Sequence, residues 1–571
     1  MSRADWIVLL ITLTGIILYG IYKSRTERSL DGYFLGDRQM PWWIVLLSIM
    51  GTQASAITFL SAPGLAYMDG MRFVQFYFGL PLAMIVISAS FVPIFHKLKV
   101  YTAYEFLQQR FDIKTRTLTS VLFLLSRGIS TGVSIYAPSI IVSSLLGWNI
   151  YWTNLFMGGL LIIYTVTGGS KSIAYTQQLQ LIIVFIGMFT AAYVVVHKLP
   201  DGIGFLDALK VGGKMGKLNV ITSGAHDGKY DWDDRYNFFN GILAGFFLQL
   251  SYFGTDQSQV GRYLTTPSVK ESRLGLLMNG LVKIPMQFAI LLIGVLVFSF
   301  YQFKPSPLFF NGAQLEKAKN GALGDSLRLL ETEYNQLNER KKAAATSYLN
   351  SSGKNTFAAE EMEAINRRGE VMRSQAKTMI KKSDASADIN DTNYIFLRFV
   401  VDNLPRGLVG LLIAMIILAS WGSIAAALNA LASTTVVDIH KQFIQKKLEP
   451  GQDYKISKWY SFAWGLFSIG IAQFAGNLGS LIEAVNILSA PFYGVILGIF
   501  LVAFYVKSIK GNALFYASIL VELVVVYLFW KSAVGYIWLV PIGAVGVMVF
   551  GWLFQIMIAK KVQSSEFKVQ S

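Results

Sequence analysis

Apolar runs of about 20 residues recur along nearly the whole chain, and they constrain its fold more than any other feature. A run of this length crosses a hydrocarbon core of roughly 30 Å as a helix, because every backbone polar group must find its partner within the segment. Only 15% of the 571 residues are charged. The sequence therefore predicts an all-α polytopic membrane protein with about 13 transmembrane helices, near residues 4–23, 41–66, 73–96, 118–147, 150–168, 177–197, 236–261, 274–302, 405–437, 456–477, 480–505, 511–530 and 535–558.

Basic residues between the runs indicate the orientation, because Lys and Arg collect in short loops on the cytoplasmic side. If the N-terminus is outside, the basic residues of alternate loops fall inside: Lys23, Arg38, Lys97, Arg110, Lys171, Arg262, Lys441, Lys507 and Lys560. The same alternation predicts a cytoplasmic C-terminus. We expect a multi-pass protein of the plasma membrane, and the inner membrane of a bacterium is favoured.

The formal net charge of +16 is largely explained by these helix ends, where basic residues meet anionic lipid headgroups. Membrane lipid is thus an expected partner, and nucleic acid is not. The absence of cysteine excludes disulfides, thiol catalysis and Cys-ligated metals, and four histidines argue against a His-based metal site. No nucleophile with a base is evident either, so the sequence does not predict an enzyme.

Two polar segments interrupt the apolar pattern, a loop at 198–235 and a longer insertion at 303–391. Apolar residues of the insertion repeat at the spacings of a coiled-coil seam: Leu323, Leu327, Leu330, Tyr334 and Leu337. The stretch "NSSGKN" at 350–355 interrupts this pattern before a second charged helical stretch. We expect an extracellular helical hairpin. A docking site for an unknown partner, or a lid over the entrance, is the alternative.

Two predicted spans contain polar interruptions near mid-membrane. The interrupting residues are Gly51, Thr52, Gln53 and Ser55 in the second span and Gln249, Ser251 and Gly254 in the seventh. Helices broken at corresponding positions of two halves are typical of secondary transporters, in which the freed backbone groups coordinate ions. Five spans lie within 41–197 and five within 236–505. Because five is an odd number of crossings, the second set must be inverted in the membrane relative to the first. Residues 1–40 then hold a preceding helix, and 506–571 hold two following helices with a short tail.

The run "LASWGSIAAALNALAS", from Leu418 to Ser433, is dense in small residues inside an apolar span. Small residues let helices approach closely, and packing alone is one interpretation. Ser420 and Ser423 also supply hydroxyls, and hydroxyl bonding to the backbone can free a carbonyl such as that of Ala419. A sodium ion needs hard oxygen ligands of this kind. The second interpretation is therefore an ion site shared with the broken second span.

Five motifs together resemble the sodium:solute symporter family, which includes sodium-coupled carriers of sugars, proline, monocarboxylates, vitamins and iodide. They are "YFLGDRQMPWW" at 33–43, "TAYEFLQQRF" at 102–111, "GGSKSIAYTQQLQ" at 168–180, "QVGRYL" at 259–264 and "LNALASTTVVDIHK" at 428–441. The resemblance covers about 2–300 and 393–510. It implies a LeuT-type fold of five plus five inverted helices, with one helix before the repeats and two after. It also implies a sodium site between the first and eighth core helices.

Taken residue by residue, the resemblance implies a set of sodium ligands. These are the carbonyls of Gly51, Ala54 and Ala419, the hydroxyl of Ser423, and Gly422 where sugar carriers often have a second serine. Gln177 falls where many members have an aspartate, which in some belongs to a second sodium site. We therefore predict one sodium ion per solute, and sodium as the only metal.

The resemblance also implies where the solute binds. The positions that match solute-contacting residues of sugar carriers are Gln53, Thr58, Tyr77, Gln249, Tyr252, Lys283 and Glu483. Tyr252 matches the aromatic residue that stacks under the sugar as an inner gate. At the position of Tyr77 those sugar carriers have a glutamate, and at the position of Glu483 they have a glutamine. The stretch "YAPS" at 136–139 is closer to the monocarboxylate, vitamin and iodide branch.

Some of these residues also have structural interpretations. Lys283 and Glu483 can form an ion pair, since a charge inside the membrane needs a partner. Arg127, within the span at 118–147, can extend its charged end toward the cytoplasmic face. Tyr252 can be ordinary helix packing.

The combined features predict a sodium-coupled symporter that imports a small organic solute by alternating access, with a sugar or sugar-derived solute favoured. A symporter for monocarboxylates or other organic anions is the alternative within the same class. A solute sensor or receptor built on a transporter scaffold is the alternative of another class, and it predicts solute binding without net flux.

Overall fold

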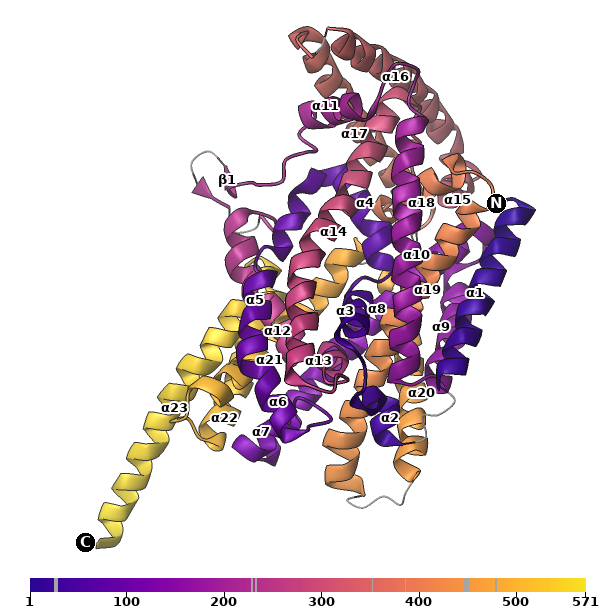
Figure 1. Cartoon of the computed structure of the whole chain (residues 1–571). Helices are drawn as coiled ribbons and strands as arrows, with labels where there is room; N and C mark the ends of the chain where they lie inside the picture. The colour runs from indigo at the N-terminus through magenta and orange to yellow at the C-terminus, as the bar shows by residue number, and fades with distance from the viewer. Residues whose placement is uncertain are drawn as a thin grey trace.

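The computed structural model is a bundle of long helices (Figure 1), described for residues 1–24, 29–226, 229–231, 234–351, 353–385, 387–445, 451–477, 480–532 and 534–570. The first half contains α1 (Arg3–Ser24), α2 (Leu30–Leu35), η1 (Gly36–Arg38), α3 (Trp42–Gln53), α4 (Ala56–Asp69), η2 (Gly70–Tyr77), α5 (Leu80–Val86), η3 (Ile87–Phe91), α6 (Val92–Leu98), α7 (Glu105–Arg110), α8 (Ile113–Leu146), α9 (Ile150–Thr167) and α10 (Ser170–His197).

The second half begins with α11 (Phe205–Lys214) and a two-residue antiparallel ribbon of β1 (Ala225–His226) and β2 (Lys229–Tyr230). It continues with η4 (Asn240–Ala244), α12 (Gly245–Thr255), α13 (Gln257–Tyr263), α14 (Val269–Phe303), α15 (Gly312–Lys319), α16 (Gly324–Asn350), α17 (Thr356–Ser383), α18 (Thr392–Asn403), α19 (Leu408–Thr434), η5 (Thr435–Ile444), α20 (Gln452–Ala472), η6 (Ala475–Asn477), α21 (Leu481–Tyr505), α22 (Gly511–Trp530), η7 (Tyr536–Trp538) and α23 (Leu539–Gln570).

Nine stretches of the described chain are long and apolar enough to cross a membrane, with α4 to α6 counted as one stretch of 43 residues. Two shorter apolar helices, Trp42–Gln53 and Ile150–Val166, accompany them. Each predicted apolar run falls on one or more helices. The predicted all-α, multi-pass architecture is confirmed, whereas the number of thirteen crossings stays a prediction.

The small-residue helix α19 lies at the centre of the bundle. Its residues are buried almost continuously from Val409 to Thr434, and it packs against α1, α3, α8, α10 and α20. Residues without bulky side chains allow this many neighbours to approach one helix. Close packing is therefore part of what the small residues do.

One helix is broken where the sequence predicts it. Helix α3 ends at Gln53, Ala54 has φ −93° and ψ 81°, and α4 begins at Ala56. Ser55 caps the new helix, because its Oγ accepts a hydrogen bond from the Ile57 backbone N–H at 3.2 Å. The last carbonyls of α3 have no following turn to bond them.

The second break is displaced from its predicted place. Gln249, Ser251 and Gly254 lie inside the continuous helix α12, and the chain leaves helical geometry at Asp256 instead. The Asp256 carboxylate accepts the Ser258 backbone N–H at 2.8 Å and so begins α13. The Ser251 hydroxyl donates a hydrogen bond to the Tyr493 carbonyl on α21, and the backbone of α12 continues through Ser251 without a break.

Helices α16 and α17 form an antiparallel hairpin at one end of the bundle, hereafter the hairpin end (Figure 1). Leu327, Leu330 and Tyr334 of α16 belong to a separate small core there. The Arg373 guanidinium contacts the Asp391 carboxylate at 2.8 Å, and both side chains are buried. Burial raises the pKa of Asp391, but the charges of Arg373 and Lys377 outweigh it and leave this pKa below its usual value. The pair therefore stabilises the hairpin at neutral pH and is lost as the pH falls through that lowered pKa.

Helix α14 crosses α4 without room for a side chain at Gly294. A Cβ atom there would lie 2.1 Å from the Pro63 carbonyl oxygen. We expect Gly294→Ala to lower the free energy of unfolding by about 1–3 kcal/mol, because two backbones must move apart. Thermal unfolding of the detergent-purified protein measures this. Gly159→Ala on α9 is the matched control, since nothing lies within 4 Å of its Cβ position. Equal unfolding midpoints for the two variants would contradict the close crossing.

Candidate functional site

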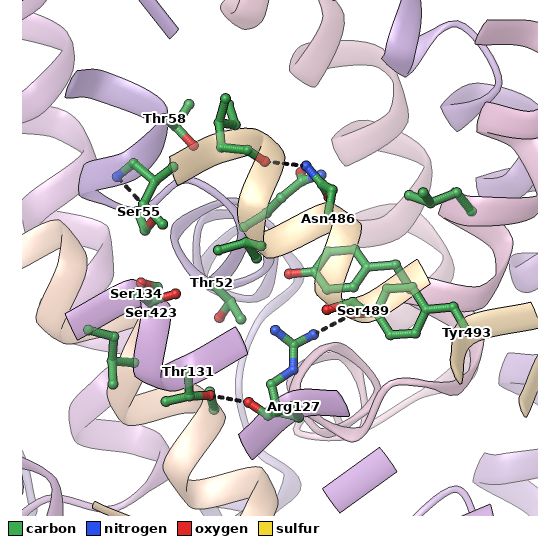
Figure 2. Close-up of a pocket in the computed structure, with 18 of the residues that line it drawn as sticks. Thr52, Ser55, Thr58, Arg127, Thr131, Ser134, Ser423, Asn486, Ser489 and Tyr493 are labelled. Atoms are coloured by element: carbon green, nitrogen blue, oxygen red, sulfur yellow. Dashed lines mark hydrogen bonds between the residues drawn. The ribbon is translucent and has the colours of Figure 1, made fainter. Parts of the chain in front are cut away.

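A partly open cavity of about 100 Å³ lies beside the break between α3 and α4 (Figure 2). Its walls come from α3, α4, η2, α8, α12, α19 and α21, which are far apart in the sequence. Seven aliphatic hydroxyls line it: Thr52, Ser55, Thr58, Thr131, Ser134, Ser423 and Ser489. Three amides and four aromatic rings complete most of the lining: Gln53, Gln249, Asn486, Phe76, Tyr77, Tyr252 and Tyr493. Such a surface offers many hydrogen bonds and several flat apolar faces.

Five of the predicted solute-binding residues lie in this lining: Gln53, Thr58, Tyr77, Gln249 and Tyr252. The Oε1 atom of Gln53 and both polar atoms of Gln249 are buried without a hydrogen-bond partner among the described residues. Buried polar atoms are paired in most proteins, so these amides are available to a ligand or to ordered water.

Ser423 is the predicted sodium ligand whose side chain the structure places most clearly. It lines the cavity from α19, and Figure 2 shows it next to Ser134 of α8. Its Oγ donates to the Ser420 carbonyl at 2.9 Å, which leaves its lone pairs directed elsewhere. Thr52 and Ser55, at the broken helix, line the same cavity.

Two of the predicted sodium ligands, Gly51 and Gly422, lie next to one side chain, that of Gln177 on α10. A Cβ at Gly51 would lie 3.0 Å from the Gln177 Cβ, and one at Gly422 would lie 3.1 Å from its Cγ. The Gln177 Nε2 donates to Thr52 Oγ1 at 3.2 Å and to the Gly422 carbonyl at 3.1 Å. Its Oε1 accepts from Ser48 Oγ at 2.8 Å. Gln177 thus connects the end of α3 to α19.

The oxygens at this junction suit sodium. Ala54 lies in the break and Ala419 one turn before Ser423, and both are nearly inaccessible to solvent. A broken helix frees backbone carbonyls that can coordinate an ion. This applies to Ala54, whereas Ala419 lies within the continuous helix α19. The Gly422 carbonyl accepts a hydrogen bond from Gln177. Glycine has no side-chain hydroxyl that could serve as a second sodium ligand at this position.

Glu483 lies outside the cavity. It sits in the first turn of α21, and its Oε1 contacts the Arg235 Nη1 at 3.1 Å and accepts from the Tyr236 hydroxyl at 2.7 Å. It lines a separate cavity toward the hairpin end, together with Asp69, Arg72 and Asp234. An ion pair between Glu483 and Lys283 was one interpretation of the sequence, and it is wrong because Glu483 pairs with Arg235.

Lys283 does not line the cavity either. It is fully buried on α14, and its Nζ lies 5.1 Å from the ring centre of Tyr77, which does line the cavity. The predicted contacts of Lys283 and Glu483 with solute stay predictions.

Arg127 lines the cavity, and it forms an ion pair with Asp256, which does not line it. Arg127, on α8, has only 11% of its side chain exposed and pairs with the Asp256 carboxylate, and its Nη2 donates to the Tyr493 hydroxyl at 3.0 Å. Tyr252 stacks over this guanidinium, with its ring centre 5.3 Å away, and accepts a hydrogen bond from Gln259 at 2.7 Å. The interpretation of Arg127 as a side chain that extends to the membrane surface is wrong, because a buried carboxylate holds it inward. Figure 2 shows Arg127 directed toward Tyr493.

Several lining residues are not among the predicted ones: Thr131, Ser134, Asn486, Ser489 and Tyr493. Two signals in the sequence mark them. Arg127, Thr131 and Ser134 follow one another at helical spacing on α8. The polar residues of α21 do the same within an otherwise apolar span.

Comparisons with known proteins agree with this geometry. A sequence model of the sodium:solute symporter family matches residues 33–317 and 370–520. The sodium/sialic acid symporter SiaT of Proteus mirabilis (strain HI4320) is 23% identical over 567 residues, which cover 98% of this chain and 96% of SiaT. The sodium-dependent multivitamin transporter of Oryctolagus cuniculus is 24% identical over 513 residues, 87% of this chain and 66% of that protein. A solved structure of a substrate-bound, outward-open Na⁺-coupled sialic acid symporter has the same fold, with a TM-score of 0.72, 22% identity and coverage of 97% and 98%.

Two broken helices beside a polar cavity define a secondary transporter of the membrane. The matched residues make up most of the chain, and the chain therefore belongs to the sodium:solute symporter family. Its members are symporters rather than enzymes, sodium is the coupling ion, and the relatives named above carry small organic solutes. The family model leaves residues 318–369 unmatched, and these include all of α16.

Proposed function

We propose that this protein imports a sugar or sugar-derived solute together with sodium by alternating access. The observation that carries this proposal is the lining of the cavity, in which seven aliphatic hydroxyls and three amides surround aromatic rings. A hydroxylated ring presents many hydrogen-bonding groups around apolar faces, and this lining complements both. Two similar bacterial proteins, SiaT and the NanT of Aliivibrio fischeri (strain ATCC 700601 / ES114), are sodium/sialic acid symporters.

An organic anion is the second candidate, and Arg127 favours it. Among the described lining residues Arg127 alone carries a formal charge. A sodium-coupled monocarboxylate transporter 1 of Xenopus laevis is 23% identical over 503 residues, 87% of this chain and 67% of that protein. Because Asp256 already neutralises Arg127, the neutral lining weighs more, and we rank a hydroxylated solute first.

We propose the LeuT-type arrangement of thirteen helices for the chain. Residues 41–197 and 236–505 are the two inverted five-helix repeats, 1–40 and 506–571 flank them, and 198–235 and 303–391 lie outside the cell. The breaks at Ala54 and Asp256 support this division, because each interrupts the first helix of one repeat. These corresponding positions are those expected of inverted repeats.

The hairpin end faces outward in this proposal. Basic residues from separate loops meet at the opposite end, where Arg38 donates to the Lys99 carbonyl at 3.0 Å and Arg110 donates to the Lys507 carbonyl at 3.1 Å. Basic residues accumulate on the cytoplasmic side. The N-terminus is then outside and the C-terminus cytoplasmic, in a plasma membrane for which the bacterial inner membrane is favoured. In this proposal membrane lipid surrounds the spans and nucleic acid is not a partner. The hairpin faces the outside, where it can contact a partner protein that is not identified.

We propose that the carbonyls of Gly51, Ala54 and Ala419 and the hydroxyl of Ser423 bind the sodium ion. Sodium would hold α3 and α19 together, which favours one arrangement of the repeats. It can do so only by binding that arrangement more tightly than the other, and its coupling to the solute must be reciprocal. The solute would bind beside the ion, and Tyr252 would move aside when the inner side opens.

The proposal is tested by charge movement in proteoliposomes on a solid-supported membrane. The protein is challenged with sialic acid, neutral sugars and monocarboxylates, first in sodium and then in potassium. A sodium-dependent current with hydroxylated solutes is expected. Solute binding in a separate assay without current or isotope uptake in any cation would replace the symporter by a solute sensor.

One sodium ion per solute is expected of the wild-type protein, because the Gln177 amide occupies the junction next to the proposed ion. At about 100 mV and a tenfold sodium gradient, one ion contributes about 3.7 kcal/mol, enough for a few hundredfold accumulation of a neutral solute. Gln177→Asp removes the N–H groups that donate to the Thr52 hydroxyl and the Gly422 carbonyl. It leaves a carboxylate near these two oxygens. We expect a second sodium ion to join them, raising the Hill coefficient for sodium from about 1 toward about 2. Gln177→Leu is the control and should stay near 1; a coefficient near 2 for the wild type would contradict the proposed stoichiometry.

A further inference from the structure

Lys283 is a buried cation for which the structure provides no anion. Its side chain has no solvent exposure, and its Nζ has neither a hydrogen bond nor an ion pair among the described residues. Its recorded neighbour is the ring of Tyr77, 5.1 Å from Nζ to the ring centre. The face of an aromatic ring attracts a cation, but it supplies no countercharge.

Two amides on the same helix share this condition. Asn279 and Gln287 lie four residues before and four residues after Lys283 on α14, and neither has solvent exposure. Side chains at this spacing lie on one face of a helix. Both polar atoms of each amide lack a hydrogen-bond partner within the described part of the chain. An ammonium group and two amides thus form a polar strip on a helix that packs against α3, α4, η2 and α5.

Arg127, unlike Lys283, has a carboxylate that balances its charge. Arg127 has the Asp256 carboxylate, the Tyr493 hydroxyl and the Tyr252 ring around it. Leaving a buried charge unpaired is strongly unfavourable, and ionisable residues inside membranes usually have a partner or a function. The amide N–H groups of Asn279 and Gln287 are further donors beside the ammonium, and a group of donors of this kind suits an anion.

We propose that Lys283, Asn279 and Gln287 form a binding site for a small anionic group, either chloride or the carboxylate of a transported solute. The site lies behind Tyr77, whose ring separates it from the solute cavity. Chloride would bind there independently of any solute. A solute carboxylate would reach Lys283 only if the Tyr77 ring moves, and this second source rests on the proposed function.

The experiment is thermal unfolding of the purified full-length protein in detergent at one fixed sodium concentration. Sodium methanesulfonate, whose anion is bulky, is the reference. Sodium chloride and the sodium salt of sialic acid are each titrated against it. An anion that binds the folded state raises the unfolding midpoint, and we expect a rise of about 2 °C or more with one of the two salts. Lys283→Met should abolish the rise, and Gln287→Leu should weaken the apparent affinity for the same anion.

Lys341→Met is the matched control. Lys341 is a second deeply buried lysine, but it lies in the hairpin and its Nζ donates to Ser306 Oγ at 3.1 Å. Its variant should keep the full response to the anion, whatever its effect on stability.

The outcomes separate the two sources. A chloride response that Lys283→Met abolishes assigns the site to chloride, even if no solute is ever transported. A response to sialic acid alone, lost in the same variant, assigns it to the solute carboxylate. The proposal is overturned if neither salt changes the midpoint of the wild type, as expected for a lysine that has lost its proton. It is also overturned if Lys283→Met and Gln287→Leu respond as the wild type does.

Discussion

We expect Ser423→Ala to raise the sodium concentration that half-saturates transport by about ten- to a hundredfold. The structure places the Ser423 hydroxyl at the cavity beside the break in α3 and α4, where the proposed ion would lie. A hydrogen-bonding group that serves a charge contributes about 1.5–3 kcal/mol, and alanine has no oxygen to replace it. Sodium titration of the solute-dependent current measures the change.

Ser433→Ala is the control for this prediction. Ser433 lies on the same helix, is buried, and donates to the carbonyl three residues before it at 2.9 Å, as Ser423 does. Ser433 is not part of the cavity lining. If both variants shift sodium dependence equally, the hydroxyl of Ser423 serves the helix and not the ion.

The second large effect is expected at the pair of Arg127 and Asp256. Arg127→Gln and Asp256→Asn each leave one buried charge without its partner, which costs about 3–5 kcal/mol of stability. The double variant removes both charges and should be more stable than at least one single variant. Chemical unfolding of the four proteins gives the coupling energy as a double-mutant cycle. Transport by the double variant then shows whether Arg127 also contacts the solute.

Arg398 and Asp402 provide the comparison for this cycle. They form a 2.6 Å ion pair one turn apart on α18, and both side chains are more than a third exposed. Exposed pairs contribute about 0–1 kcal/mol, so their cycle should give a much smaller coupling. Equal coupling at the two pairs would contradict the expected effect of burial on the pair of Arg127 and Asp256.

Much of the fold could be predicted from the sequence because the relevant properties are local. The apolar runs predict where helices lie, since a helix bonds its own backbone and needs only a length and a composition. The break after Gln53 follows from residues next to one another, Gly51 to Ser55. Five residues of the cavity lining were likewise implied by the resemblance to the symporter family.

The errors concern residues whose partners are distant in the sequence. The sequence shows charges at positions 127, 256, 283 and 483, but it does not show which of them meet. Arg127 pairs with Asp256 across 129 positions, and Glu483 pairs with Arg235, nearly twice as far away in the sequence, instead of with Lys283. The displaced second break has this origin in part, because the Ser251 hydroxyl donates to the distant Tyr493 carbonyl on α21. The Asp256 cap of α13 is local.

The sequence by itself determined that this protein is a bundle of apolar helices, broken at Ala54 and crowded with small residues on α19, with the motifs of a sodium symporter. Those properties depend on helix length, hydropathy and neighbouring residues. Only the tertiary structure decided that seven elements line one cavity and that Asp256 balances Arg127. It also decided that no carboxylate among the described residues pairs with Lys283. The physical reason is that the environment of a buried charge is set by helix packing, which brings together residues that no local pattern relates.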